Sequence, residues 1–233
     1  MIRYLLIVDT ETTAKNHMVA DFGAVVVDLS RPRDKQVIRE LGIFVWDAYN
    51  HPLWFNPRAP KGDFWHKDNL KTRQKQQESY VDEGERALAV SKNINKWLKE
   101  VHDEFNPICT AYNWKFDKKV CANTGINLEQ FQNGPQWCLY NLAKKMLVNN
   151  EVYRNHCLAN GYVTEKGNIQ FTADSVSNFI FWSRGEVKGA EPHTALEDAK
   201  MYELPIAQEL FAHGWLDDLK PTEANEGDDD ATE

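Results

Sequence analysis

Apolar runs separated by short polar turns occupy the first 46 residues of the chain. Three strand-like stretches lie near residues 4–10, 19–29 and 36–46, and the loops between them are too short to hold a helix. Consecutive strands joined by such short loops pair antiparallel. The first stretch is apolar from Tyr4 to Val8, which is typical of a strand buried on both faces.

Helical spacing of apolar residues follows further along the chain. A helix is expected near residues 85–102, where apolar side chains recur every three or four positions: Ala87, Val90, Ile94, Trp97, Leu98 and Val101. A strand near 107–112 comes next, then helices near 115–124, 139–149, 173–182 and 194–213, with a polar hairpin-like region at 159–172. Pro205 should kink the last helix and Gly214 suits its end. This order indicates an α/β fold, with a mixed sheet flanked by helices.

The first strand ends in two acidic residues, Asp9 and Glu11. Side chains alternate along a strand, so both carboxylates project from the same face. Two adjacent carboxylates repel each other unless a cation lies between them, and hard cations such as Mg²⁺ prefer oxygen ligands. The alternative is two solvated acids at the end of a strand, because the Asp-x-Glu pattern is common by chance.

Another acidic residue follows the strand predicted near residues 107–112. The run Asn113-Trp114-Lys115-Phe116-Asp117 stands where this strand gives way to a helix. Asp117 is therefore expected at the carboxyl edge of the sheet, where open α/β sheets form their clefts. Alternatively, Asp117 only complements the dipole of that helix from its first turn.

The third cluster contains His193 and Asp198. Thr194 and Glu197 have the spacing of a capping box, which places His193 on the preceding loop and Asp198 in the first turns of a helix. Both side chains could then point into one cleft. The alternative is a capped helix with an exposed acid and an ordinary loop histidine.

Together these motifs resemble the DEDDh family of 3′–5′ exonucleases, which includes polymerase proofreading subunits, RNase T and oligoribonuclease. The resemblance rests on Asp9-x-Glu11, Asn113-x-x-Phe116-Asp117 and His193-x-Ala195-x-x-Asp198, and spans roughly residues 4–213. Residues 19–29 also look like the family's second strand with its Gly-Ala pair. The overall layout resembles a phage-type stand-alone exonuclease. The family implies an RNase H-like five-stranded sheet, with three antiparallel N-terminal strands and then parallel strands.

The resemblance also implies roles for individual residues. Asp9, Glu11, Asp117 and Asp198 would hold two Mg²⁺ or Mn²⁺ ions, roughly 3.5–4 Å apart in two-metal sites. His193 would be the general base, because an imidazole titrates near neutral pH. Backbone groups around Thr10 and Thr12 would contact the terminal nucleotide. Asn113 more simply braces the turn before Asp117.

Residues 48–77 combine aromatic and basic side chains and carry a net charge of +4. Bases stack on exposed rings while cations follow phosphates, a combination suited to single strands. The candidates for base contact are Phe64 and Trp65, with Phe116 nearer the cleft. Alternatively, the rings simply cover one side of the sheet.

Composition limits the remaining possibilities. With 233 residues and 42% apolar content, one domain suffices. No run approaches a membrane span, and the N-terminus enters a strand at once without the zones of a signal peptide, so a cytoplasmic location is expected, or the host cytoplasm for a phage protein. The four cysteines form no Cys-x-x-Cys pair and are expected to be reduced packing residues.

The formal charge of −8 is concentrated at the C-terminal end. Residues 217–233 carry −7, leaving about −1 for the preceding 216 residues. We therefore expect an exonuclease domain at 1–216 and an acidic disordered tail at 217–233. The tail could be an inert solubilising segment or could mimic nucleic acid.

The resemblance thus implies a two-metal 3′–5′ exonuclease acting on single-stranded nucleic acid with a free 3′ end, and the phage-like layout favours DNA. An exoribonuclease of the RNase T or oligoribonuclease type is the alternative, as is a catalytically silent nucleic-acid-binding module. A metal-dependent esterase for small phosphates would leave the basic aromatic segment without a purpose. No membrane partner is expected, and nothing identifies a protein partner.

Overall fold

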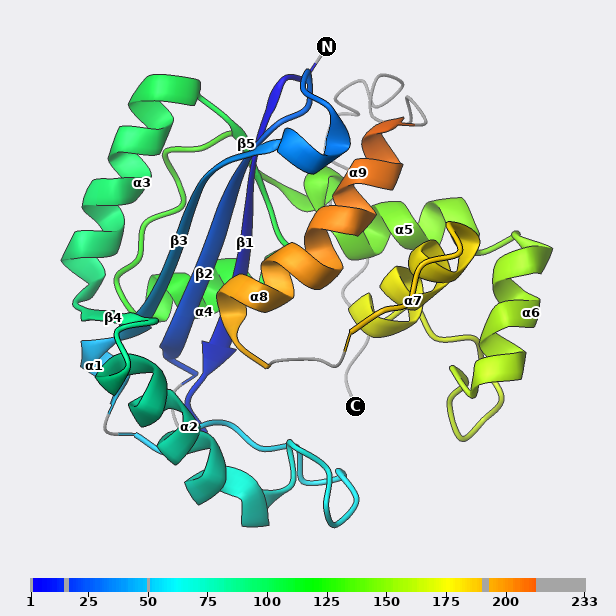
Figure 1. Ribbon diagram of the computed structural model, residues 1–233, viewed down its shortest axis with the longest axis horizontal. Helices are drawn as coiled ribbons and strands as arrows, with labels where there is room; N and C mark the ends of the chain where they lie inside the picture. Colours follow the sequence, from blue (N-terminus) through cyan, green and yellow to red (C-terminus); the bar gives the residue numbers. More distant parts are fainter. Residues whose placement is uncertain (1, 15–16, 50, 190–192, 213–233) are drawn as a thin grey trace, which may run out of the picture.

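Five strands form one mixed sheet in the order β4-β3-β2-β1-β5 (Figure 1). The computed structural model describes residues 2–14, 17–49, 51–189 and 193–212. Strands β1 (Tyr4–Thr12), β2 (Val19–Asp28) and β3 (Val37–Val45) pair antiparallel, whereas β4 (Ala87–Ala89) pairs parallel with β3 and β5 (Ile108–Thr110) pairs parallel with β1. The predicted α/β fold with a mixed five-stranded sheet is confirmed.

Helices cover both faces of this sheet (Figure 1). The even-numbered side chains of β1, such as Leu6 and Val8, pack with α3 (Ser91–Phe105) and α4 (Trp114–Asn123). The odd-numbered Leu5 and Ile7 pack with α5 (Leu139–Leu147), α7 (Ala173–Ser183) and α9 (Leu204–Ala212). Because β1 is buried on both sides, it reads as a continuous apolar run.

The remaining elements connect these layers or pack against them. They are the 3₁₀ turns η1 (Arg33–Lys35), η2 (Lys67–Asn69) and η3 (Pro135–Trp137), the helices α1 (Trp46–Tyr49), α2 (Leu70–Asp82), α6 (Glu151–Asn160) and α8 (Ala195–Asp198), and the π-helical turn η4 (Ala199–Glu203). None of the described helices is both long and apolar enough to cross a bilayer. The predicted acidic tail at 217–233 and the helix end at Gly214 lie outside the described residues.

The helix expected near 85–102 was placed too early. Residues 87–89 form β4 instead, and α3 begins at Ser91. A three-residue strand has no periodicity of its own, and the exposed edge of β3 supplies hydrogen bonds that override the helix propensity of Ala87 and Leu88. Helices α2 and α6 were not predicted. Within α2 the one buried side chain is Arg73, so no apolar stripe marks that helix.

Candidate active site at the carboxyl ends of β1 and β5

The first carboxylate pair lies on the face of the sheet that α8 and α9 cover. Leu5 and Ile7 pack into the core on this face, and the two-residue period of β1 carries Asp9 and Glu11 to the same side. Both acids follow the buried part of the strand, so their side chains are half-buried. The prediction that they share a face is confirmed.

Asp198 joins this pair from the far end of the chain. One carboxylate oxygen from each of Asp9, Glu11 and Asp198 lies within 4.8 Å of the other two. Three oxygen donors and no sulfur or nitrogen donor in this group suit a hard divalent cation such as Mg²⁺ or Mn²⁺. The residues present therefore fit the metal that the sequence predicts.

Asp117 approaches the same place from the opposite face of the sheet. It lies in the first turn of α4 with 4% of its surface exposed, and the Thr10 hydroxyl donates a 2.7 Å hydrogen bond to its Oδ1 atom. Its backbone N–H donates to the carbonyl of Asn113, so Asn113 braces the turn through its backbone. Asp117 is thus neither remote from Asp9 nor a merely exposed helix acid.

All four predicted carboxylates line one pocket of about 230 Å³. Asn113 and Phe116 line it too, and 38% of Phe116 is exposed at the surface. Sequence reasoning missed part of the lining, namely Tyr112, Asp174, Tyr202 and Glu203. No motif flagged these residues: Tyr112 lies between β5 and α4, Asp174 lies on α7, and Tyr202 and Glu203 lie on η4.

The π-helical turn explains the position of Glu203. The N–H of Leu204 bonds to the carbonyl of Ala199, five residues back, where an α-helix would use four. Pro205 has no N–H, and its ring crowds the carbonyl four residues before it, so a wider turn relieves the strain. The irregularity predicted at Pro205 therefore takes the form of a π turn just before it. Glu203 is only 3% exposed.

This concentration of carboxylates perturbs their titration. Burial raises the pKa of Asp9 well above its usual value, and the charges of Glu203, Asp117, Glu11 and Asp198 raise it further. Burial also raises the pKa of Asp117 to about 7, although the hydrogen bond from Thr10 opposes this. Burial away from water disfavours the charged form of both carboxyls, and for Asp9 the neighbouring like charges add to this effect. A bound cation would reverse them.

The N-terminus of α8 is capped by a strand residue, so the predicted capping box is wrong. Thr194 occupies the N-cap position, but its hydroxyl donates to the Glu197 carboxylate. The backbone N–H of Ala195 instead donates to Asp21 Oδ2 on β2, at 2.9 Å. A buried acid from a neighbouring strand therefore replaces the local cap, which sequence spacing cannot reveal.

His193 lies beside the carboxylate pocket and against the aromatic segment. Its ring stacks on Phe64 with the centroids 3.7 Å apart and meets Trp65 edge-on at 5.6 Å. These three residues and Glu11 line a second, smaller pocket, so Glu11 is a wall of both pockets. The sequence placed His193 and the two rings in separate parts of the site.

Arg73 holds the two rings in place. It is 1% exposed, its guanidinium lies 5.3 Å from the Phe64 ring centroid and 4.6 Å from that of Trp65, and it donates to the carbonyls of Phe64 and Trp54. Burial lowers the pKa of Arg73, and the charge of Glu11 opposes this. Both rings are half-buried and contact His193, and their predicted contact with bases stays a prediction.

The two threonines of the first motif are both buried. The Thr10 side chain serves Asp117, as above, and the Thr12 carbonyl accepts a hydrogen bond from the Trp54 N–H at 2.7 Å. Thr10 lines the carboxylate pocket. The predicted backbone contacts with a terminal nucleotide stay predictions.

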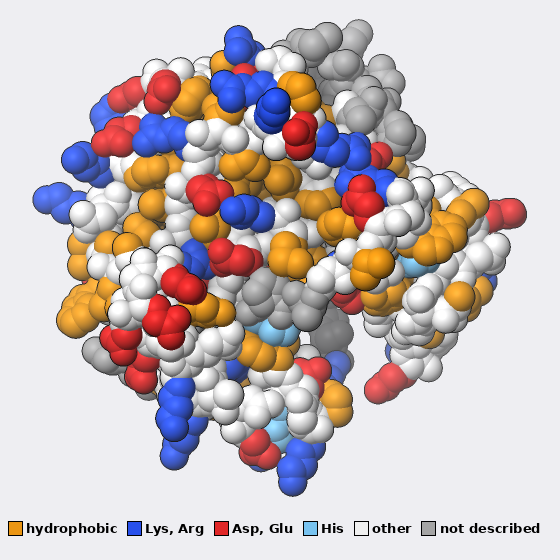
Figure 2. All heavy atoms as spheres, viewed as in Figure 1, with side chains coloured by type: hydrophobic (Ala, Val, Ile, Leu, Met, Phe, Trp, Pro, Cys, Tyr) orange, Lys and Arg blue, Asp and Glu red, His pale blue; other side chains and the backbone are white. Residues whose placement is uncertain are grey.

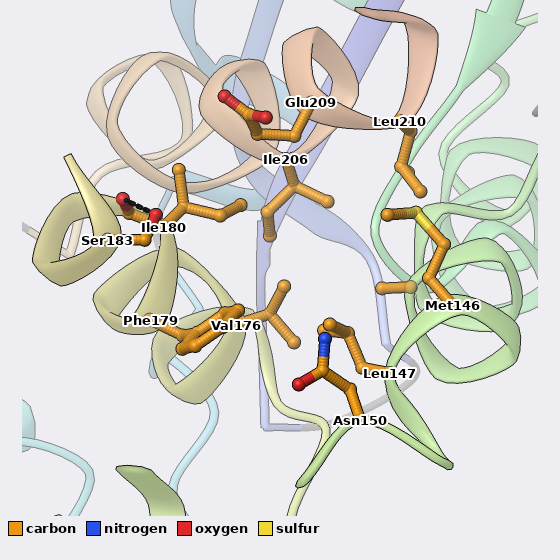
Figure 3. Close-up of a pocket in the computed structure, with 11 residues that line it drawn as sticks. Met146, Leu147, Asn150, Val176, Phe179, Ile180, Ser183, Ile206, Glu209 and Leu210 are labelled. Carbon is orange, nitrogen blue, oxygen red and sulfur yellow. Dashed lines mark hydrogen bonds between the residues drawn. The ribbon is translucent and has the colours of Figure 1, made fainter. Parts of the chain in front are cut away.

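An apolar cavity of about 160 Å³ lies elsewhere, between α5, α7 and α9 (Figure 3). Its labelled lining is largely aliphatic, including Met146, Val176 and Ile206. Of the described residues that line it, Glu209 carries the one carboxylate, and this is paired with Arg184 and Arg33. The cavity therefore offers no group for catalysis.

Neither a protein-family model nor a curated protein matches this sequence. Similar solved structures include "Exonuclease X in complex with 5′ overhanging duplex DNA", with 14% identity, a TM-score of 0.48, and 91% of this chain and 93% of that chain covered. The structure "3′-end specific recognition of histone mRNA stem-loop by 3′-exonuclease" has 13% identity and a TM-score of 0.49. Cell-death related nuclease 4 (CRN-4) has 15% identity and a TM-score of 0.48.

For both of these latter structures, 91% of this chain matches 65% of the other, so the chain spans somewhat less than two thirds of their length. At these identities and TM-scores the likeness carries no weight for activity. The chemistry is therefore inferred from the side chains of this chain alone.

Proposed function

We propose that this chain is a metal-dependent 3′–5′ exonuclease that hydrolyses single-stranded nucleic acid, with DNA as the favoured substrate. One observation carries the proposal. Four carboxylates from three distant segments line a single pocket, and three of them offer oxygens within 4.8 Å of one another. Such crowding is costly without cations, and isolated exposed acids would not be gathered in this way.

The residues divide into ligands and a base. Asp9, Glu11 and Asp198 would hold one divalent ion, and Asp9 with Asp117 would serve a second. When bound, such ions neutralise charge at the phosphate and acidify an attacking water. His193 would take the proton of that water on an imidazole nitrogen. The water oxygen would form the new bond to phosphorus while the bond to the 3′-oxygen of the preceding nucleotide breaks. That oxygen would take a proton from solvent and remain as the 3′-hydroxyl of the shortened strand, and a nucleoside 5′-monophosphate would be released.

The surface near the pocket supports a single-stranded substrate. Phe116 stands partly exposed at the pocket, where a base can stack on it. Basic side chains project at the lower end of the view in Figure 2, where Figure 1 places α2 and the loop before it. Exposed basic residues of this segment are Arg58, Lys61, Lys67, Lys71 and Lys75. Phosphates of a strand entering the pocket could follow them.

Digestion of matched 5′-labelled DNA and RNA oligonucleotides tests the proposal. With Mg²⁺ we expect a ladder of products that shorten from the 3′ end, faster on DNA, and no products in EDTA. Asp198→Asn should abolish the ladder while the protein stays folded. Internal cleavage, or digestion that EDTA leaves intact, would overturn the proposal. Faster digestion of RNA would replace the favoured substrate by the exoribonuclease alternative.

A second assay separates the enzyme from a silent binding module. Ca²⁺ often supports binding of nucleic acid at a carboxylate site without supporting hydrolysis. We expect a single strand to bind in Ca²⁺ and to be digested after exchange into Mg²⁺. Binding in both ions with no digestion in either would identify a binding module.

A further inference from the structure

Arg86 is a buried arginine at the junction between α2 and β4. Its side chain is 5% exposed, and its Nη2 atom lies 2.6 Å from Glu197 Oε2 and 3.6 Å from Asp21 Oδ2. The guanidinium fills the space above Gly42, where an added Cβ would lie 1.5 Å from Nη1. A buried guanidinium is tolerated only when it is paired, so these contacts restrict its position closely.

Asp21 connects this arginine to the third motif. It is fully buried on β2, directly opposite Glu11 in the strand register. Its Oδ2 atom accepts the hydrogen bond from Ala195 that caps α8. Glu197, on α8 itself, accepts a hydrogen bond from the same Nη2 atom of Arg86 that lies near Asp21. Two residues of the same short helix therefore contact one network of charges, in which Arg86 and Asp21 are buried and Glu197 is 41% exposed.

Gly23 lets α8 sit directly on the sheet. It pairs with Asp9 in the register of β1 and β2, and an added Cβ would lie 2.2 Å from the carbonyl carbon of Ala195. No side chain could fit between the strand and the helix at this position. The helix backbone thus rests beside Asp9, and Arg86 with Asp21 governs how it is oriented there.

We propose that Arg86 and Asp21 are positioning residues for the metal pocket: they hold α8 so that Asp198 faces Asp9 and Glu11. The inference rests on the proposed function only for its consequence in catalysis. Its effect on metal binding can be measured separately. A pair of this kind acts on affinity through the orientation of the ligand, as outer-shell partners of metal sites do. A purely structural ion pair would affect unfolding and leave the metal affinity unchanged.

Calorimetric titration of Mn²⁺ into the full-length protein distinguishes these roles. Arg86→Gln should weaken Mn²⁺ binding roughly 10- to 100-fold, the usual cost of losing an outer-shell partner. Hydrogen exchange at the backbone amides of residues 195–198 should become faster in the same variant. Arg86→Lys, which keeps the charge and loses the fork, should recover part of the affinity. Asp21→Asn should resemble Arg86→Gln.

Arg184→Gln is the matched control. Arg184 is 15% exposed and pairs with Glu209 at 2.5 Å on the α7 and α9 side, so its loss should lower stability without changing Mn²⁺ affinity. The inference is overturned if folded Arg86→Gln binds Mn²⁺ like the wild type, or if Arg184→Gln weakens binding equally. If Arg86→Gln fails to fold, the Mn²⁺ affinities of Arg86→Lys and Asp21→Asn test the inference instead. Wild-type affinity in both variants would overturn it.

The outcomes also separate this inference from the proposed function. A wild-type protein that binds Mn²⁺ and degrades no nucleic acid would overturn the nuclease, while weakened binding in Arg86→Gln would still support the positioning role. If the wild type digests nucleic acid and the Arg86→Gln variant binds Mn²⁺ with unchanged affinity, only the positioning role is overturned. No Mn²⁺ binding by the wild type would overturn both.

Discussion

Replacing Asp117 by Asn should stabilise the metal-free protein at high pH. Asp117 is 4% exposed and shares its pocket with three other predicted ligands. Asn has nearly the same shape, and its Oδ1 can still accept the hydrogen bond from Thr10. The substitution therefore removes the charge while it leaves the packing and this hydrogen bond in place.

The magnitude follows from the pKa of Asp117, which burial raises from 3.8 to about 7. Between these values the folded state retains a proton that the unfolded state has released, so stability falls as pH rises. The difference of about three pH units, at about 1.36 kcal/mol each, sets an upper value of about 4 kcal/mol. Neighbouring carboxylates share this cost, so about 2–4 kcal/mol is expected above pH 7, and about zero near pH 4.

Urea denaturation in EDTA from pH 4 to pH 8 measures this difference. Asp117→Asn should match the wild type at pH 4 and exceed it progressively as pH rises. Saturating Mn²⁺ should reduce or cancel the difference, because binding at 100 times Kd stabilises the wild type by about 2.7 kcal/mol. Glu129→Gln, at a side chain 70% exposed beside Lys118, should show no such trend. If Asp117→Asn is less stable than the wild type at pH 8 in EDTA, the electrostatic reasoning is wrong.

Three further predictions concern the proposed base His193, the contact of Gly23 with α8, and residues 217–233. His193→Ala should lower single-turnover cleavage by roughly 10²–10⁴-fold with Mn²⁺ affinity retained, and full-rate digestion by this variant would exclude it as the base. Gly23→Ala should lower the free energy of unfolding by about 1–3 kcal/mol, measured with urea, because the new methyl group meets the backbone of Ala195. Deleting residues 217–233 should leave single-strand affinity unchanged at every salt concentration. A change in the salt dependence would favour the nucleic-acid mimic.

The strand periodicity carried the most reliable information about the site. Because strand side chains alternate, Asp9 and Glu11 could be placed on one face from sequence alone, and the structure confirms this. Asp117 was expected at the carboxyl edge of the sheet because it follows a predicted strand, and it lines the same pocket as the pair. Both inferences depend on local backbone geometry, which a few neighbouring residues determine.

Other features depended on contacts between distant residues. Strand β4 forms because the edge of β3 is available, and the cap of α8 comes from Asp21, 174 positions away from Ala195. The stack of Phe64 on His193 brings together segments that the sequence treats as unrelated. Neither periodicity nor propensity encodes such pairings, because they arise from the packing of the whole chain.

By itself, the sequence determined the class of fold, the two acids on one face of β1, and the chemical types gathered in the three motifs. Only the tertiary structure decided that Glu203 joins the pocket, that Arg86 and Asp21 hold α8, and that His193 lies against Phe64. The physical reason is the difference between interactions that are local in sequence and contacts between residues far apart in sequence. Hydrophobic periods and turn residues act over a few positions, whereas the distance between two charges is set by every strand and helix packed between them.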